Sequence, residues 1–476
     1  MKIKKRTLRI STLRIVIIIL LSTINPIFAQ NKVLSLQQDS IVSLVRKAYL
    51  YAMPLIYTDV TRLTYNIPDN TLLHNHSFPD DTFHNVVAPN NDTNYSIAFL
   101  ELNNEPVVIT TPDTKGRYYV FPFLDGWTNN FSIIGKRTTG THPQKYLITG
   151  PNWKGKVPIG LKKIKSPTNL VWIIGRIQVN SKKDQKEFVV PIQDQFKLIT
   201  LSKWLKKDTS AVQPQYKRYG SYLIENTNKK VPEVVKDLSI EDFFNYFNAL
   251  LKDNPPAAID KEIIQEIASI GIKAGGHFSL NDFDANTRKA LKLIPLNVYN
   301  DFAENKKWES TSGETAKAKE GNPRDYKTNY ALRAQIAYGG LGALPPEEAI
   351  YYSYYNDSHK EPLDGQNNYI IHFDKGQLPP AQEFWSYTIY GKDRYLTANA
   401  IKRYAIGNRN KLNFNKDGSL TIYLSHKAPE KNKINNWLPI PDKVFNIVAR
   451  IYVPTPEFLK NRSIWENPLP QKIDNK

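Results

Sequence analysis

The stretch GRYYVFPFLDGWTNNFSIIGKRTTG, residues 116–140, indicates how most of this 476-residue chain folds. Two runs of aromatic and β-branched residues flank DGWT, and Asp and Gly are typical of turns. Similar short runs recur as EPVVITTP (residues 105–112) and LVWIIGRIQV (residues 170–179). Strands this short and this closely spaced predict a β-sandwich from about residue 71 to residue 204.

The hydrophobic period changes to that of a helix on both sides of this region. DSIVSLVRKAYLYAMPLIY (residues 39–57) predicts an opening helix, and LSIEDFFNYFNALLKDNPP (residues 238–256) begins with the capping-box pair Ser239 and Asp242. IDKEIIQEIASIGIKAGG (residues 259–276) and NDFDANTRKALKLIP (residues 281–295) continue the helical period. The middle of the chain therefore predicts a small helical module.

Strand-like runs return in the last third of the chain. They include NNYIIHFDKG (residues 367–376), FWSYTIYG (384–391) and VFNIVARIYVPTP (444–456). KLNFNKDGSLTIYLS (411–425) adds an Asp-Gly pair that predicts a hairpin. This pattern predicts a jelly-roll-like sandwich. The expected domains are an N-terminal sandwich with its leading helix (residues 38–210), a helical module (215–320) and a C-terminal β domain (325–476).

Residues 1–29 have the pattern of a secretory signal peptide. Six basic residues and no acidic one precede the apolar run IVIIILL (residues 15–21), and Ala29 is the expected cleavage site. The apolar run is far shorter than the ~20 residues of a membrane-spanning helix. We therefore expect an exported protein, periplasmic or extracellular, that meets the membrane only during export. An uncleaved anchor is the less favoured alternative.

The amino-acid composition excludes several classes of site and of binding partner. The chain has no cysteine, which excludes disulfides, thiolate zinc sites and cysteine nucleophiles. Removal of the six basic residues of the leader lowers the net charge from +19 to +13. The lysines are dispersed and no arginine-rich arm is present, so we expect no nucleic-acid partner. Anionic glycans or lipid headgroups are partners that would match this positive charge. The simpler alternative is a basic surface that is merely solvated. Whether the protein forms a homo-oligomer stays open.

Long stretches of the chain resemble a bacterial family of two paired domains. HSFPDDTFHNVVAPNNDTNYS (residues 76–96), residues 116–140 and VWIIGR (171–176) resemble domain of unknown function 1254. YGGLGALPPEEAIYYSYYNDSHKEPLDGQNNYIIHF (338–373) and RYAIGNR (403–409) resemble domain of unknown function 1214. The resemblance implies an immunoglobulin-like N-terminal sandwich, a helical middle and a C-terminal jelly roll, so the expected class is mainly β. It leaves the biochemical role unsettled.

The polar run that follows Pro89 is the first candidate site. Asn and Asp side chains readily form turns, which explains one or two of its residues. Amide, carboxylate and hydroxyl groups beside aromatic rings also suit a sugar, so a turn and a ligand edge both stay open. The candidate ligand-binding residues here and in the neighbouring strands are Asn90, Asn94, Tyr95, Arg117, Tyr119 and Trp127.

A second candidate lies in ANAIKRYAIGNR (residues 398–409), where Asn399 and Arg403 stand near a glycine turn. Arginines spaced in this way could clamp a carboxylate or a sulfate, and a structural role is the preferred alternative.

His74 and His76 are candidates for chemistry. Residues two apart on a strand share a face, so both imidazoles could reach one metal ion with His84 or Asp92. We predict no cofactor, and a divalent cation stays open. If the protein is an enzyme, His74 is the general base or metal ligand, and Asp92 orients it or acts as the acid.

The sequence leaves three functions open. We expect an exported protein that binds a small polar molecule, such as a glycan or a cell-envelope component, through its β domains. The alternatives are a hydrolase or lyase acting on such a ligand and a structural envelope protein without a small ligand. No G-x-S-x-G elbow is present, which excludes an ordinary α/β-hydrolase, and no Walker loop is present. The sequence does not decide whether any other reaction is catalysed.

Overall fold

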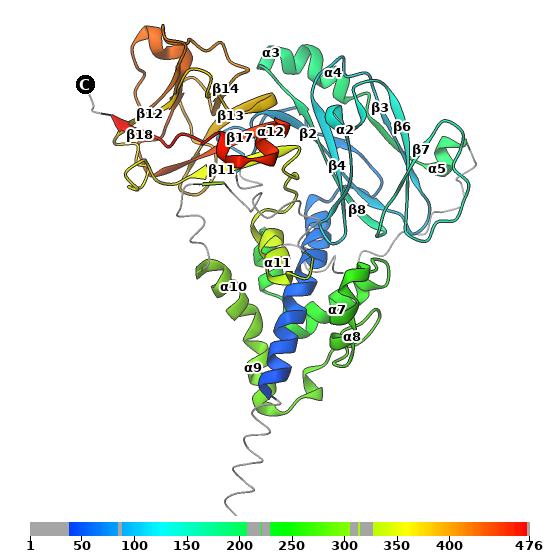
Figure 1. Cartoon of the computed structure of the whole chain (residues 1–476). Coiled ribbons are helices and arrows are strands. Elements are labelled where there is room, and N and C mark those ends of the chain that lie inside the picture. The colour runs from blue at the N-terminus through cyan, green and yellow to red at the C-terminus, as the bar shows by residue number, and fades with distance from the viewer. Residues whose placement is uncertain are drawn as a thin grey trace, which may run out of the picture.

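A computed structural model describes residues 38–83, 88–206, 220, 229–304, 313–314 and 327–473. Two β-sandwiches lie side by side, and a helical module lies below them in the view of Figure 1. The predicted class, sandwiches with a helical middle, is confirmed. The predicted signal peptide, residues 1–29, lies outside the described residues.

The N-terminal sandwich pairs a five-stranded sheet with a four-stranded sheet. Its strands are β1 (Leu73–His74), β2 (Thr93–Glu101), β3 (Val107–Thr111), β4 (Tyr119–Asp125), β5 (Asn130–Gly135), β6 (Gln144–Thr149), β7 (Lys162–Lys165), β8 (Leu170–Gln178) and β9 (Lys197–Thr200). The strand orders are β1-β2-β8-β4-β5 and β7-β6-β3-β9. Alternate residues such as Ala98, Ile109, Phe121 and Ile173 face inward and form the shared core.

Short helical segments border this sandwich. They are α2 (Lys136–Thr139), α3 (Lys182–Asp184), the π-turn Gln185–Val189, α4 (Val190–Gln193) and α5 (Leu201–Trp204). Ser181 caps α3, because its hydroxyl accepts from the amide of Asp184.

The helical module is built around the leading helix, residues 38–65. Its other helices are α6 (Val231–Lys236), α7 (Ile240–Leu251), α8 (Lys261–Ala268), α9 (Ala285–Lys292), α10 (Ile294–Glu304) and α11 (Tyr330–Gly339), with 3-10 turns at Ala258–Asp260 and Leu280–Asp282. Ser239 caps α7 as expected, since its Oγ accepts from the amide of Asp242 at 3.0 Å.

Two elements belong to the helical module rather than to the β domains with which the sequence grouped them. The leading helix is apolar on nearly all sides, and Tyr49, Leu55 and Ile56 are fully buried against α7 and its neighbours. Tyr330 and Ala334 of α11 belong to the same core. Both helices therefore pack inside the module.

The C-terminal sandwich repeats the two-sheet plan. Its strands are β10 (Gly313–Glu314), β11 (Ala349–Tyr354), β12 (Asn368–Phe373), β13 (Ala381–Gly391), β14 (Ala405–Gly407), β15 (Leu420–Ser425), β16 (Trp437–Pro439), β17 (Phe445–Pro454) and β18 (Gln471–Ile473). The strand orders are β10-β11-β17-β13-β14 and β16-β15-β12-β18. Helix α12 (Pro456–Lys460) and the 3-10 turns Lys431–Asn436 and Arg462–Ile464 complete this domain.

The predicted Asp417-Gly418 turn forms, but it does not join two strands. The amide of Asn415 donates to the carbonyl of Ser419 at 2.9 Å, and Gly418 has φ +87°. Residues 411–415 are not a strand. Both edges of β15 are already occupied, by antiparallel β12 and parallel β16, so no edge is left for the preceding segment.

The core of the N-terminal sandwich is packed tightly around Gly175. A Cβ atom at this position would lie 2.5 Å from the ring of Phe121, and that ring stacks on Phe196 at 4.7 Å. We expect Gly175→Ala to lower the free energy of unfolding by about 1–3 kcal/mol, measured by urea denaturation. Gly340→Ala is the control, because its nearest contact would be 3.7 Å away. Equal losses in the two variants would contradict this packing.

Candidate functional site

The outer faces of the two five-stranded sheets face each other. Tyr118 and Val120 from the N-terminal sandwich share an apolar cluster with Ala349, Phe384 and Tyr452 from the C-terminal sandwich. The rings of Phe384 and Tyr452 stack at 4.1 Å, and Tyr118 meets both rings edge-on. We call the space between these sheets the interdomain layer.

Strand register places two matching rows of polar side chains in the interdomain layer. On the N-terminal side Tyr95 pairs with Arg176 across β2 and β8. On the C-terminal side Arg450 of β17 pairs with Tyr351 of β11 and with Ser386 of β13. Side chains of paired residues project from the same face of a sheet. Each sheet therefore presents one arginine next to one tyrosine.

The polar run after Pro89 is where the two sandwiches join. The Oδ1 atom of Asn90 accepts from the amide of Asp92 at 2.7 Å, which is a turn, one of the two interpretations that the sequence left open. The Nδ2 atom of Asn90 donates to the hydroxyl of Tyr452 at 2.6 Å, and the hydroxyl of Tyr390 donates to the carbonyl of Pro89 at 2.7 Å. The run is a turn held by the opposite domain.

Asp92 forms an ion pair across this joint. Its side chain is fully buried, forms an ion pair with Arg409 and accepts from the Ser386 hydroxyl at 2.6 Å. Arg409 also donates to the backbone carbonyl of Asp92 at 3.0 Å and to that of Val179, and its guanidinium lies 4.5 Å from the centre of the Phe384 ring. One arginine of the C-terminal sandwich therefore binds two segments of the N-terminal sandwich.

Further ion pairs cross between the domains nearby. Arg137 pairs with Glu348 at 2.6 Å, and the hydroxyl of Tyr118 donates to the same carboxylate at 3.0 Å. Burial raises the pKa of Glu348, while the charge of Arg137 opposes that shift. Lys136 pairs with Glu383 at 2.8 Å. These contacts hold the two facing sheets in one relative position.

Arg176 and Arg450 are the two buried cations of the interdomain layer, with 6% and 4% of their surface exposed. Arg176 donates to the carbonyls of Ile174 at 3.2 Å and Gly342 at 3.1 Å. Arg450 donates to the hydroxyls of Thr388 and Tyr390, each at 2.8 Å. Within the described ranges neither guanidinium has a carboxylate within 4.0 Å.

Two tyrosines beside these arginines, Tyr351 and Tyr452, keep their protons. Burial raises the pKa of Tyr351 and of Tyr452, so both hydroxyls can donate hydrogen bonds at neutral pH. Burial by itself would lower the pKa of Arg176, but the electrostatic effect of Tyr95, Tyr351 and Tyr452 outweighs it and raises the pKa. The layer therefore holds positive charge and hydroxyl donors.

Tyr95 and Tyr351 differ from their neighbours in exposure. Both are half-buried, whereas Arg176, Arg450 and Tyr452 are buried. The ring of Tyr95 lies 5.2 Å from the guanidinium of Arg176, and the charges of Arg176 and Arg450 both act on Tyr351. These two tyrosines come from opposite sheets and keep accessible surface beside both cations.

The structure brings only part of the predicted site together. Asn90, Asp92 and Tyr95 lie at the interdomain layer. Asn94 projects from the other face of β2, where it contacts Gln193 at 3.1 Å and Gln185 at 2.6 Å. The remaining predicted residues, described next, are His74, Arg117, Tyr119, Trp127, Asn399 and Arg403.

His74 lies on the edge strand β1, and its Nδ1 atom is 2.8 Å from the Ser96 hydroxyl. The charged groups that act on its pKa are Asp194, His76 and Lys197, not Asp92. The structure therefore does not place Asp92 where it could orient His74, as the enzyme hypothesis requires.

Arg117 and Tyr119 have structural partners inside the N-terminal sandwich. Arg117 pairs with Asp184 at 2.6 Å and donates to the carbonyl of Gln178 at 3.0 Å. The ring of Tyr119 belongs to the sandwich core, and its hydroxyl donates to the carbonyl of Gly140 at 3.1 Å.

Trp127, Asn399 and Arg403 also lie away from the interdomain layer. Trp127 is buried against Tyr51 of the helical module, and its Nε1 atom donates to the carbonyl of Pro255 at 3.1 Å. Asn399 accepts from the amide of Arg403 at 2.9 Å. Arg403 donates to the carbonyls of Ile434 at 2.8 Å and Trp437 at 2.7 Å. These groups hold loops and domains together.

The two imidazole rings lie near each other, although His76 follows the end of β1 and shares no strand with His74. The rings of His74 and His76 are parallel with centres 6.1 Å apart, and His76 pairs with Asp194 at 2.7 Å. His84 falls outside the described residues. Among those that are described, no group of three or more His, Asp or Glu side chains is arranged to hold a metal ion.

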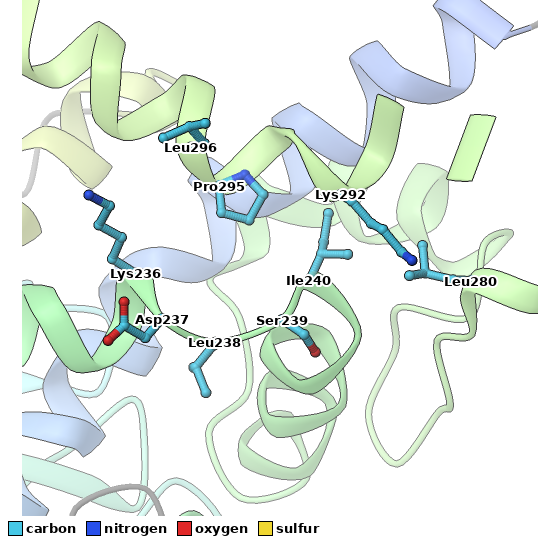
Figure 2. Close-up of a pocket in the computed structure, with 9 residues that line it drawn as sticks. All are labelled: Lys236, Asp237, Leu238, Ser239, Ile240, Leu280, Lys292, Pro295 and Leu296. Atoms are coloured by element: carbon cyan, nitrogen blue, oxygen red, sulfur yellow. The ribbon is translucent and has the colours of Figure 1, made fainter. Parts of the chain in front are cut away.

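Figure 2 shows a pocket of about 310 Å³ in the helical module. Lys236 and Lys292 lie on opposite sides of it. Two of its polar groups already have local partners: Asp237 pairs with Lys229 at 2.6 Å, and the hydroxyl of Ser239 caps α7. The pocket therefore offers little beyond two lysines and apolar side chains.

Sequence reasoning missed Arg176, Tyr351, Arg450 and Tyr452. A signal for the arginines exists in the sequence, because each is a single charged residue inside an otherwise apolar strand, in LVWIIGRIQV and VFNIVARIYV. Charged residues are rarely buried without a partner. Nothing in the sequence, however, indicates that the two strands face each other.

Asp92→Asn tests whether the joint depends on its buried ion pair. Loss of the negative charge leaves Arg409, whose side chain is only 13% exposed, with no counter-charge, so we expect a loss of about 3–5 kcal/mol in the free energy of unfolding. The control is Glu266→Gln, which breaks the exposed pair with Lys47 and should cost less than about 1 kcal/mol. Urea denaturation measures both, and similar losses would contradict the prediction.

His74 predicts a dependence of stability on pH. Burial is the main cause that lowers the pKa of its imidazole below 6.5, so the unfolded chain binds this proton more readily than the folded chain. Its contribution to stability is present above that pH and is lost as the pH falls. Between about pH 7.5 and pH 5.5 the melting temperature of His74→Gln should therefore fall less than that of the unmodified protein.

The control for this experiment is His277→Gln, at an exposed position of the helical module. It should lose as much stability on acidification as the unmodified protein. If His74→Gln also loses that much, the assignment of this pH dependence to His74 is wrong.

Comparison with known proteins supports the family resemblance. The family described as protein of unknown function DUF1254 matches residues 70–200, and the one described as protein of unknown function DUF1214 matches residues 348–456. No curated protein matches the chain. Among the described residues, no helix is both long and apolar enough to cross a membrane.

Two solved structures are similar to this one. The VPA0106 protein from Vibrio parahaemolyticus is 26% identical with a TM-score of 0.69, over 91% of this chain and 100% of that one. An uncharacterised protein from Burkholderia cenocepacia is 12% identical with a TM-score of 0.43, over 92% of this chain and 97% of that one. The two family matches occur in the expected order, and the chain therefore belongs to the family that pairs DUF1254 with DUF1214.

Proposed function

We propose that this protein is an exported binding protein whose interdomain layer holds a polar, negatively charged ligand, with an acidic glycan of the cell envelope as the best-fitting class. The observation that carries the proposal is the pair of buried arginines, Arg176 and Arg450, next to the half-buried Tyr95 and Tyr351. The leader-like pattern of residues 1–29 supports export.

Electrostatics favour an anion at this place. A buried guanidinium loses its hydration, and its carbonyl and hydroxyl partners bring no opposite charge. Arg450 feels the charge of Asp92, but that carboxylate is already paired with Arg409. The groups that act most on the pKa of Arg176 are tyrosines rather than carboxylates. An anionic ligand would supply the missing counter-charge.

The shape of the donor groups favours a carboxylate or sulfate attached to a flat polar molecule. Guanidinium groups bind such anions with two parallel hydrogen bonds. The rings of Tyr95 and Tyr351 offer apolar faces to a sugar ring, and their hydroxyls offer polar edges. An acidic sugar combines all of these features. The hydrolase or lyase alternative has no comparable support, since His74 and Asp92 have separate surroundings.

Calorimetric titration of the mature chain with galacturonate oligomers, and with neutral galactose oligomers of the same length, tests this proposal. We expect binding of the acidic oligomers only. The melting temperature should rise as well, since a free ligand concentration of one hundred times the dissociation constant stabilises the folded state by about 2.7 kcal/mol.

Two variants locate the binding site. Arg176→Lys keeps the charge but removes the planar fork, and Tyr351→Phe removes one hydroxyl, so each should weaken binding by about tenfold. Tyr352→Phe is the matched control, because Tyr352 is the next residue of β11 and packs against the core of the C-terminal sandwich. Equal binding of neutral and acidic oligomers, or equal effects of Tyr351→Phe and Tyr352→Phe, would count against the proposal.

A further inference from the structure

The outer face of the four-stranded sheet β7-β6-β3-β9 carries its own apolar cluster. Val108 and Leu147 project away from the core of the N-terminal sandwich and are buried with Leu161. Trp153 and Trp204 cover this cluster and are only half-buried. In Figure 1 this sheet lies at the edge of the molecule that is farthest from the C-terminal sandwich. We call this surface the tryptophan face.

Lysines surround the two tryptophans. The Nζ atom of Lys145 lies 5.4 Å from the Trp204 ring centre, and that of Lys163 lies 5.3 Å from the Trp153 ring centre. Strand register places Lys163, Lys165 and Lys197 on the same outer face as Lys145, and all four lysines are exposed.

The sequence around the tryptophan face has no acidic residue over a long distance. None occurs between Asp125 and Asp184, a segment that includes β5 to β8. Glu105, in the turn before β3, is bound by the amide and hydroxyl of Ser202 at 2.7 and 2.8 Å. The lysines of this face are therefore available to an anionic partner.

The loop of residues 150–161 adds an exposed apolar tip. Ile159 is 105% exposed and Val157 is 37% exposed, and Lys154 and Lys156 beside them are exposed too. Among the large apolar residues of the described chain, no other reaches the exposure of Ile159. The loop ends at Leu161 of the apolar cluster, so its exposed tip lies close in sequence to an apolar surface rather than standing alone.

We propose that the tryptophan face and the 150–161 loop form a docking surface for a membrane that contains anionic lipids. Lysines attract the headgroups, tryptophans favour the interface, and Ile159 and Val157 enter the acyl boundary. An anionic polysaccharide would match the charge but would leave both apolar side chains in water. The proposal differs from the expectation that this protein meets the membrane only during export, and it does not depend on the interdomain layer.

Vesicle co-sedimentation of the mature chain tests the docking surface. Vesicles of equal parts phosphatidylglycerol and phosphatidylcholine should bind the protein, and phosphatidylcholine vesicles should bind it at least about tenfold more weakly. Added salt should release it, because the attraction is screened within a Debye length.

Variants at exposed positions identify the surface without endangering the fold. The double variant Lys145→Gln/Lys163→Gln should reduce binding by about tenfold or more, and Ile159→Ser by about threefold or more. Controls on the C-terminal sandwich are Lys375→Gln/Lys416→Gln, which removes the same charge, and Ile464→Ser, at a position 49% exposed. They should bind as the unmodified protein does.

Three results would overturn the proposal. These are no binding to either kind of vesicle, equal binding to both kinds, and equal losses in the control variants. Binding of dextran sulfate without binding of vesicles would identify a polysaccharide surface instead. None of these results depends on binding of galacturonate oligomers, so the two proposals can fail separately.

Discussion

The ion pair between Asp92 and Arg409 is the contact on which the arrangement of the domains depends. Asp92 immediately precedes β2 and Arg409 follows β14, so the pair joins the facing sheets of the two sandwiches. Ser386 and the backbone of Val179 extend the contact on either side. A buried charge pair tolerates little displacement, because separation leaves both charges without water and without a partner. It therefore sets the position of one sheet against the other.

That position gives the interdomain layer its chemistry. Two sheet faces that would each be solvated in an isolated sandwich are covered by one another, and Arg176 and Arg450 become buried as a result. Their hydrogen bonds to carbonyls and hydroxyls satisfy N–H donors of the guanidinium groups, but these partners carry no negative charge, so the positive charge stays in the interior. The helical module contributes through the turn after α11, where the carbonyl of Gly342 accepts from Arg176. All three parts of the chain thus meet at the candidate site.

Periodicity was enough to predict the elements. Alternating runs correspond to strands such as β8 and β17, and the capping pair at Ser239 marks the start of α7. Periodicity was not enough to predict which strands and helices pack against each other. Residues 411–415 have a strand-like pattern but no free sheet edge to join, and the leading helix packs in the core of the helical module. Asn90, Asp92 and Tyr95 were predicted as a site because polar residues cluster there, whereas Arg117 and Trp127 have local structural partners.

By itself the sequence determined the two sandwiches, the helical middle and the family, because each is encoded in local patterns or contiguous motifs. Only the tertiary structure decided which sheet faces meet, which places Tyr351 and Arg450 opposite Tyr95 and Arg176. Residues this far apart in sequence come together through the packing of whole sheets, and a single sequence carries no local signal for that packing. The candidate site is therefore a property of the assembled domains rather than of any one segment.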